Sequence, residues 1–198
     1  PAYASGSSWD MSDYLAKASP VFRREVGRAS LRPKWKASRI IRVADVAALG
    51  DCVEENPGSI GFLDLGEAKR HAEVHDIIAV GKREPVVYGR GVNKKTVLET
   101  VYRHPTFEGM TTAGTAAQRV INLRLMFDVI NTRAVGAYPI TVGGWVAFRS
   151  DRRMSTDTRK ALRAMLSDRA QDRLHGLGYA PLPKGIRAKA LAAVNAAR

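Results

Sequence analysis

Short apolar runs alternate with amphipathic helical patterns along almost the whole chain, and this alternation limits what the sequence can fold into. Helical spacing of apolar residues is clearest over residues 43–55, 156–166 and 185–197. Strand-like apolar runs occupy residues 60–65, 77–80, 85–88, 123–130 and 140–148. Because alternating helices and strands build a sheet covered by helices, the pattern predicts an α/β architecture.

Proline, glycine and serine mark the borders of the other predicted segments. In chain order, the sequence predicts a first helix that Pro20 ends or restarts, a short second helix (21–27), an irregular basic stretch (30–42), a turn (56–58), a helix (66–76) and a helical turn ending at Leu174. Residues 89–118 give the least clear pattern, and a helix over 94–103 is one interpretation. Gly176 and Gly178 are candidate helix C-caps.

Composition bounds the class of protein. The chain has 198 residues, of which 45% are hydrophobic, and this is enough to build a core for one or two lobes. Its formal net charge of +13 attracts anions in general and does not choose among them. The basic residues are scattered among acidic and apolar residues, whereas nucleic-acid interfaces concentrate them on one stripe. The pattern therefore favours a solvated basic surface, and we do not expect nucleic acid as a partner.

The cysteine content and the length of the apolar runs exclude further classes of protein. Cys52 is the only cysteine, so no disulfide forms within the chain and thiols cannot build a zinc site. It falls in a helical pattern, and we expect it to be a small buried hydrophobe. No apolar run approaches the roughly 20 residues of a membrane-spanning helix. The chain starts at Pro1 without a signal peptide or an initiator methionine, and we expect it to be a processed or shortened form.

The segment Ser5-Gly6-Ser7-Ser8 carries the most suggestive chemistry of the chain. A helix start exposes backbone N–H groups, and the helix dipole adds a partial positive charge there. Gly6 lets an anion approach the backbone, and the serine hydroxyls are further donors. Asp10 would add negative charge to the first turn. From these residues alone, an anion site and a plain helix cap both remain open.

Other motifs point away from metal and enzyme chemistry. His71 and His75 would share one helix face, but the run His71-Ala-Glu-Val-His75 lacks the metalloprotease arrangement, and an exposed helix face explains them better. The sequence contains no Gly-x-Ser-x-Gly elbow and no Walker phosphate loop, and Gly89-Arg-Gly91 lacks the rest of a dinucleotide fingerprint. We therefore expect no enzyme activity, no cofactor and no metal.

Four segments in order resemble the phosphate-binding proteins of ABC phosphate importers. The helix start Ser5-Gly-Ser-Ser, with its continuation to Pro20, resembles the family's Ser-Gly-Thr-Thr helix. Pro57-Gly-Ser-Ile-Gly-Phe62, Ala137-Tyr-Pro-Ile140 and Leu177-Gly-Tyr-Ala-Pro-Leu-Pro183 resemble a turn and strand, a return segment and a closing motif of the same family. The resemblance covers nearly the whole chain and is weakest over residues 89–118.

This resemblance implies the type II periplasmic-binding-protein fold, in which two α/β lobes close on a ligand. Residues 1–138 would form the second lobe, and residues 139–198 would cross back and complete the first lobe. Most of the first lobe would come from an N-terminal part that lies outside this chain. The implied function is capture of inorganic phosphate or a related oxyanion in the periplasm, for delivery to ABC permease subunits.

The resemblance also assigns the site. Ser5, Gly6 and Ser7 match the phosphate-contacting Ser-Gly-Thr, and Ser8 completes the predicted phosphate-binding set. The family's preceding Arg and Asp are Pro1 and Tyr3 here. Three explanations stay open: the pocket takes another oxyanion, upstream residues or Arg39 and Arg42 compensate, or phosphate binding is lost. In the last case the chain would be a basic interaction module for a polyanion or a protein partner.

Overall fold

The computed structural model describes residues 4–71, 76–122, 125–148 and 153–197. Pro1, Tyr3 and His75, which the sequence analysis singled out, lie outside the described residues. Within these ranges the chain is a mixed α/β protein with eight α-helices and one two-stranded antiparallel hairpin. The elements are α1 (Gly6–Ala18), α2 (Pro20–Glu25), α3 (Ala47–Glu55), α4 (Leu65–Ala68), β1 (Val80–Tyr88), β2 (Lys95–Arg103), α5 (Phe107–Ala117), α6 (Thr156–Met165), α7 (Asp168–Asp172) and α8 (Lys184–Ala196). Single 3₁₀ turns occupy Lys69–His71, Gly91–Asn93 and Leu174–Leu177.

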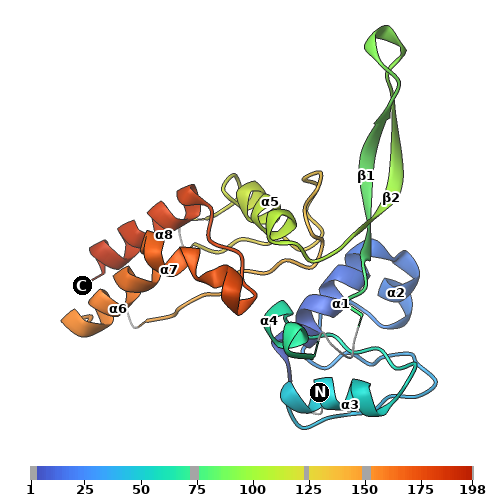
Figure 1. The fold of residues 1–198 in the computed structure, drawn as a ribbon, viewed down its shortest axis with the longest axis horizontal. Helices are drawn as coiled ribbons and strands as arrows, with labels where there is room; N and C mark the ends of the chain where they lie inside the picture. Colours follow the sequence, from blue (N-terminus) through green and yellow to red (C-terminus); the bar gives the residue numbers. More distant parts are fainter. Residues whose placement is uncertain (1–3, 72–75, 123–124, 149–152, 198) are drawn as a thin grey trace.

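The helices gather in two parts, and the hairpin rises above α1 and α2 (Figure 1). We call the described residues of 4–71 the N-terminal part and those of 104–197 the C-terminal part. The N-terminal part contains α1 to α4, the C-terminal part contains α5 to α8, and the two described chain ends lie in different parts.

Aromatic rings hold the N-terminal part together. Trp35, in the irregular stretch after α2, packs against Phe22 at 6.0 Å and Phe62 at 5.8 Å between ring centroids. Aromatic pairs at this separation add stability beyond the area that they bury. Trp35 thus ties α2 to the segment that leads into α4, although three different regions of the sequence supply the rings.

Small residues form the core of the C-terminal part. Its fully buried members come from α5, the loop that follows it and α8, and they are Ala113, Ala117, Val129, Ala137 and Ile186. Alanine side chains let the backbones approach closely, because they occupy little volume. The core joins residues on both sides of position 138, and the division into lobes at that position remains a prediction.

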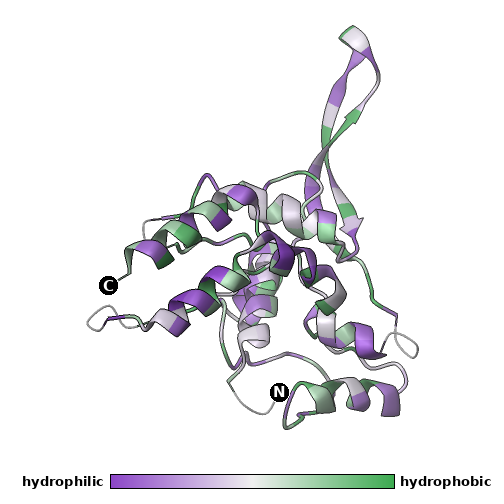
Figure 2. Ribbon diagram, turned by 60° about the vertical axis from the view of Figure 1, so that its left-hand side comes forward, coloured by the Kyte–Doolittle hydropathy of each residue, from purple (hydrophilic) through white to green (hydrophobic). Residues whose placement is uncertain are grey.

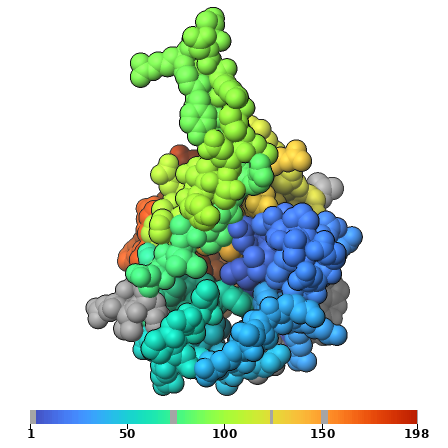
Figure 3. Space-filling view, turned by 90° about the vertical axis from the view of Figure 1, so that its right-hand side faces the viewer, coloured from blue at the N-terminus to red at the C-terminus, as the bar shows by residue number. Residues whose placement is uncertain are grey.

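The hairpin of β1 and β2 stands clear of both parts, as the space-filling view of Figure 3 shows. Its register runs from Val80 opposite Arg103 to Tyr88 opposite Lys95. Lys82 and Glu84 at its base are buried, whereas every residue from Val87 to Thr96 is exposed. The base is therefore anchored in the fold and the tip is surrounded by solvent.

Several sequence predictions are confirmed with shifted ends. The helices predicted at 156–166 and 185–197 are α6 and α8, and the helix predicted at 43–55 begins later, at Ala47. The turn at Asn56-Pro57-Gly58 forms, with Gly58 at a φ of 82°. Gly178 ends a 3₁₀ turn at a φ of 83°, whereas Gly176 lies inside that turn. Cys52 is half-buried rather than buried.

Two kinds of prediction are wrong. The segment 94–103 forms no helix: its residues from Lys95 to Arg103 are strand β2, in which exposed residues alternate with inward ones at the strand period of two. The described residues of the apolar runs at 60–65, 77–79, 123–130 and 140–148 form no strands. A strand needs a neighbour for its backbone groups, and no parallel sheet occurs among the residues that the structure describes.

Hydrophobic and hydrophilic residues are mixed along each helix (Figure 2). Among the described helices, none is long and apolar enough to cross a membrane.

Candidate functional site

Ser5 caps helix α1. Its backbone is extended, and its hydroxyl accepts a hydrogen bond from Ser8 N–H at 3.4 Å while its carbonyl accepts one from Trp9 N–H at 3.1 Å. Its own N–H donates to Leu31 carbonyl at 3.1 Å, which ties the helix start to the following loop. Ser5 and Ser8 are both buried. These two serines are thus part of the helix cap, as the plain-cap interpretation expects.

Gly6 and Ser7 occupy the open side of the same turn. Among the described residues, no acceptor is found for the N–H of Gly6 or of Ser7. An ideal Cβ built on Gly6 meets no heavy atom of the described residues within 4 Å, so these residues leave the space in front of it open. First-turn N–H groups have no partner inside a helix and need an acceptor from elsewhere. Two backbone donors and the half-exposed Ser7 hydroxyl can therefore face an anion or water.

The acidic residues of α1 lie beyond its first turn. The first turn contains no acidic residue, because α1 begins at Gly6 and Asp10 falls beyond that turn. Burial, followed by the charges of Asp13 and Asp128, raises the pKa of Asp10 above its ordinary value. Arg39 and Arg42 are exposed, and in the described part of the chain neither forms a hydrogen bond with Ser5, Gly6, Ser7 or Ser8. The positive character of the site therefore comes from the helix end itself.

The candidate site is open rather than enclosed. Two surface grooves lie elsewhere: one runs between α2 and Trp35, and the other lies between α8 and the junction of α6 and α7. Neither groove is lined by any residue of the set Ser5, Gly6, Ser7 and Ser8. Within the described chain, a ligand at this turn would be held from one side only.

The other three segments that carry the family resemblance occupy positions where backbone conformation or burial restricts the choice of residue. Gly58 and Gly178 adopt left-handed backbone conformations that favour glycine. Ala137 and Pro139 are fully buried, and Tyr138 N–H donates to Gly109 carbonyl at 3.0 Å. Burial and then the neighbouring Tyr14 raise the pKa of Tyr138 to about 12, so its hydroxyl stays protonated. These segments shape the backbone and the core, and among the described residues none of them forms a hydrogen bond with the start of α1.

A buried ion network lies at the base of the hairpin. Glu84 accepts hydrogen bonds from Arg103 Nη2 at 2.7 Å and from Gly136 N–H at 3.2 Å, and it pairs with Lys82 at 3.2 Å. Lys82 also donates to the carbonyls of Ala134 and Ala137. Burial raises the pKa of Glu84, but the Arg103, Gly136 and Lys82 bonds outweigh it and hold that pKa below its ordinary value. The buried charged groups of this network all have hydrogen-bond or ion-pair partners, so we interpret the network as structural.

A cluster of possible metal ligands was missed by the sequence analysis. The side chains of Asp51, Glu54 and His71 offer ligand atoms that all lie within 4.8 Å of one another. From the sequence, His71 and His75 were expected to share an exposed helix face, with no metal role for either. The spacing of Asp51 and Glu54 on one helix face was a usable signal, but only the fold brings the histidine to them.

The fold is mixed α/β, and its candidate anion site is an open helix start. The sequence matches no protein-family model, and no curated protein matches it.

Proposed function

We propose that this chain captures an oxyanion, inorganic phosphate first among them, at the start of helix α1. The observation that carries the proposal is the pair of backbone donors on Gly6 and Ser7, which have no acceptor among the described residues and face open space. A tetrahedral oxyanion fits such a turn because it offers acceptors in several directions to N–H groups and hydroxyls. Ser5 and Ser8 would hold the turn in shape, and the Ser7 hydroxyl would add a third donor.

The openness of the site supports the two-lobed arrangement that the sequence resemblance implies. In a type II periplasmic-binding-protein fold, the ligand is held between lobes, so one lobe alone presents a one-sided site. Residues 1–138 would belong to the second lobe and residues 139–198 to the first. We propose a solute-binding protein that works in the periplasm and delivers its anion to ABC permease subunits by closing on it.

The test is a calorimetric titration with phosphate in moderate salt, with sulfate as the comparison ligand. Gly6→Val places a branched side chain in front of the donors, and the open space at Gly6 lets the fold accept it. We expect saturable phosphate binding by the wild type and at least about a tenfold weaker affinity in the variant. Gly144→Val is the matched control, since a Cβ there also meets no atom within 4 Å. Equal affinity of wild type and Gly6→Val would contradict the site.

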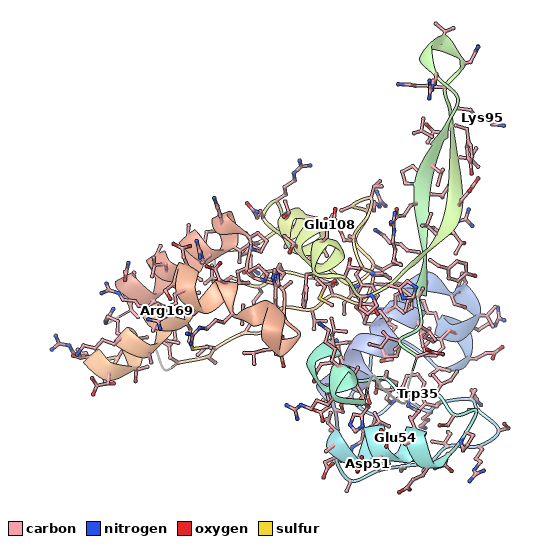
Figure 4. All side chains as sticks on the ribbon, viewed as in Figure 1. Trp35, Asp51, Glu54, Lys95, Glu108 and Arg169 are labelled. Carbon is pink, nitrogen blue, oxygen red and sulfur yellow. The ribbon has the colours of Figure 1, made fainter. Side chains whose placement is uncertain are left out.

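Polyanion binding at the hairpin tip is the second candidate, favoured by one observation. The exposed tip carries Arg90, Lys94 and Lys95, and residues 88–96 contain no acid. Lys95 projects into solvent near the end of the arm in Figure 4. This candidate predicts affinity for long-chain polyphosphate that falls steeply with salt and does not change in Gly6→Val. The same titration, repeated with that probe at two salt concentrations, separates the two functions.

A further inference from the structure

The structure assigns a second ligand site to this chain: we propose that Asp51, Glu54 and His71 bind a divalent transition-metal ion, with zinc as the best fit. Asp51 and Glu54 lie on α3, and His71 ends the 3₁₀ turn that follows α4. Figure 4 places both acidic residues on α3, at the edge of the N-terminal part away from the hairpin. The inference is independent of oxyanion capture at α1.

The spacing of the ligand atoms carries the proposal. One nitrogen and two carboxylate oxygens lie within 4.8 Å of one another. Ligand atoms that share a tetrahedral zinc ion at about 2.1 Å lie roughly 3.4 Å apart, so only small shifts of the three side chains would be needed. Asp51 is exposed and can make this adjustment by changing rotamer, whereas Glu54 already contacts the imidazole, with its Oε1 2.9 Å from Nδ1.

The imidazole is the fixed member of the set. A Cβ built on Gly50 would lie 2.6 Å from both Cδ2 and Cε1 of His71, so the ring packs directly on the bare backbone of α3. On its other side, Nδ1 lies 2.9 Å from Glu54 Oε1. Glycine at position 50 thus lets the ring lie flat against the helix that supplies both carboxylates. A ring held on a helix in this way costs little further entropy when an ion binds.

Ligand chemistry selects the class of metal. One imidazole and two carboxylates suit zinc and its first-row neighbours, whereas calcium and magnesium prefer oxygen ligands alone. In the Irving–Williams order affinity rises to copper and falls again at zinc, and zinc accepts a tetrahedral set of three protein ligands with a fourth position open for water. The ion would take the place of the contact between Nδ1 and Glu54, so Nδ1 must give up any proton that it holds. Binding should therefore weaken as the solution becomes more acidic.

The test is a calorimetric titration of the whole chain with zinc chloride at neutral pH in a buffer without phosphate. We expect one site per chain in the wild type, and an affinity at least about tenfold lower in His71→Gln, Asp51→Asn and Glu54→Gln. Glu55→Gln is the matched control, because it removes an exposed acid from the same helix without touching the cluster. Thermal unfolding in the presence of a chelator checks that each variant folds.

Cobalt provides a second readout that reports the ligands directly. We expect a visible absorption band on addition of cobalt chloride to wild type and Glu55→Gln, and a lost or shifted band in His71→Gln. Zinc affinity and cobalt spectrum unchanged in all three cluster variants would overturn the proposal, as would the absence of any zinc binding by the wild type. Neither outcome bears on phosphate binding, because the helix start of α1 contributes no ligand.

Discussion

At the scale of single residues, short hydroxyl side chains hold this protein together. Ser12 is fully buried, and its hydroxyl accepts a bond from Ser30 N–H at 3.0 Å and contacts Ser30 carbonyl at 3.3 Å. Side-chain oxygens also cap most of the helices, at Ser5, Ser19, Asp64, Thr106, Ser155 and Ser167. Caps of this kind contribute about 1 kcal/mol each, because they satisfy first-turn N–H groups. The helix starts are therefore encoded locally.

Asp10 is a residue whose removal should stabilise the fold. Burial and the nearby acids raise its folded pKa above the unfolded value. The native state then binds the proton more tightly, so stability falls as pH rises through this range and stays lower above it. Asp10→Asn should raise the unfolding free energy at pH 7 by roughly 0.5 kcal/mol after discounting for solvent screening, and by nothing at pH 3. Urea unfolding at the two pH values measures this, and an equal gain at both would refute the electrostatic cause.

At the scale of elements, the hairpin is the feature that most needs an explanation. A two-stranded ribbon is marginal by itself in water. Here its base is fixed by the buried network of Lys82, Glu84 and Arg103 and by the Tyr14 hydroxyl, which donates to Gly81 carbonyl. These contacts join β1 to α1 and to the loop of residues 134–137. The strands thus depend on their anchor more than on their own pairing.

Glu84→Gln should detach this anchor. Loss of the carboxylate charge leaves Lys82 and Arg103 without their shared ionic partner. We expect the free energy of unfolding to fall by about 3 kcal/mol at pH 7. Because the folded pKa of Glu84 is lowered, its contribution is present above the unfolded pKa and disappears as pH falls through the folded pKa. The difference between wild type and variant should therefore shrink toward pH 3. Chemical unfolding followed by circular dichroism measures it.

Glu99→Gln is the control for the anchor, since Glu99 lies directly opposite Glu84 in the hairpin register. Its carboxylate accepts a bond from the Tyr88 hydroxyl at 2.8 Å on the exposed arm. We expect Glu99→Gln to change the free energy of unfolding by less than about 0.5 kcal/mol. Similar losses in the two variants would mean that the charge of the arm matters and not the buried network.

At the scale of the whole molecule, a few specific contacts join the two parts. Lys17 on α1 pairs with Asp128 in the C-terminal part at 2.6 Å, and Lys69 lies 4.5 Å from the centre of the Phe107 ring. Burial lowers the pKa of Lys17, but its bonds to Asp128 and Asp13 outweigh this and raise it, so the pair stays charged. Gly66 of α4 and Gly178 approach so closely that side chains are excluded between them.

Gly178→Ala tests whether that close approach matters to the whole fold. A Cβ there would lie 2.5 Å from Gly66 N, and the φ of 83° is unfavourable for alanine. Backbone strain and overpacking together should lower the free energy of unfolding of Gly178→Ala by about 2–4 kcal/mol. Gly176→Ala, where a Cβ meets nothing within 4 Å, should change stability by less than about 0.5 kcal/mol. Thermal unfolding compares them, and equal melting temperatures would show that the contact between the parts contributes nothing.

The sequence by itself determined the local features of this protein. Side-chain caps fix where α1, α2 and α6 begin, Pro183 precedes α8, and Gly58 and Gly178 adopt the turn conformations that glycine permits. The helix start at Ser5, Gly6, Ser7 and Ser8 was also found from the sequence, because a cap and its N–H groups depend on neighbours within one turn. Periodicity indicated helices together with strands, although most of the strands that it predicted did not form.

Only the tertiary structure decided which apolar runs became strands and which side chains met. The runs at 60–65 and 140–148 have strand composition, but a strand forms only where another strand accepts its backbone hydrogen bonds. In the described residues β1 and β2 find each other, and those runs do not. Likewise, Asp51, Glu54 and His71 become a candidate metal site because Gly50 lets a distant imidazole lie on α3. Contacts between residues far apart in the chain depend on packing, and local periodicity carries no information about them.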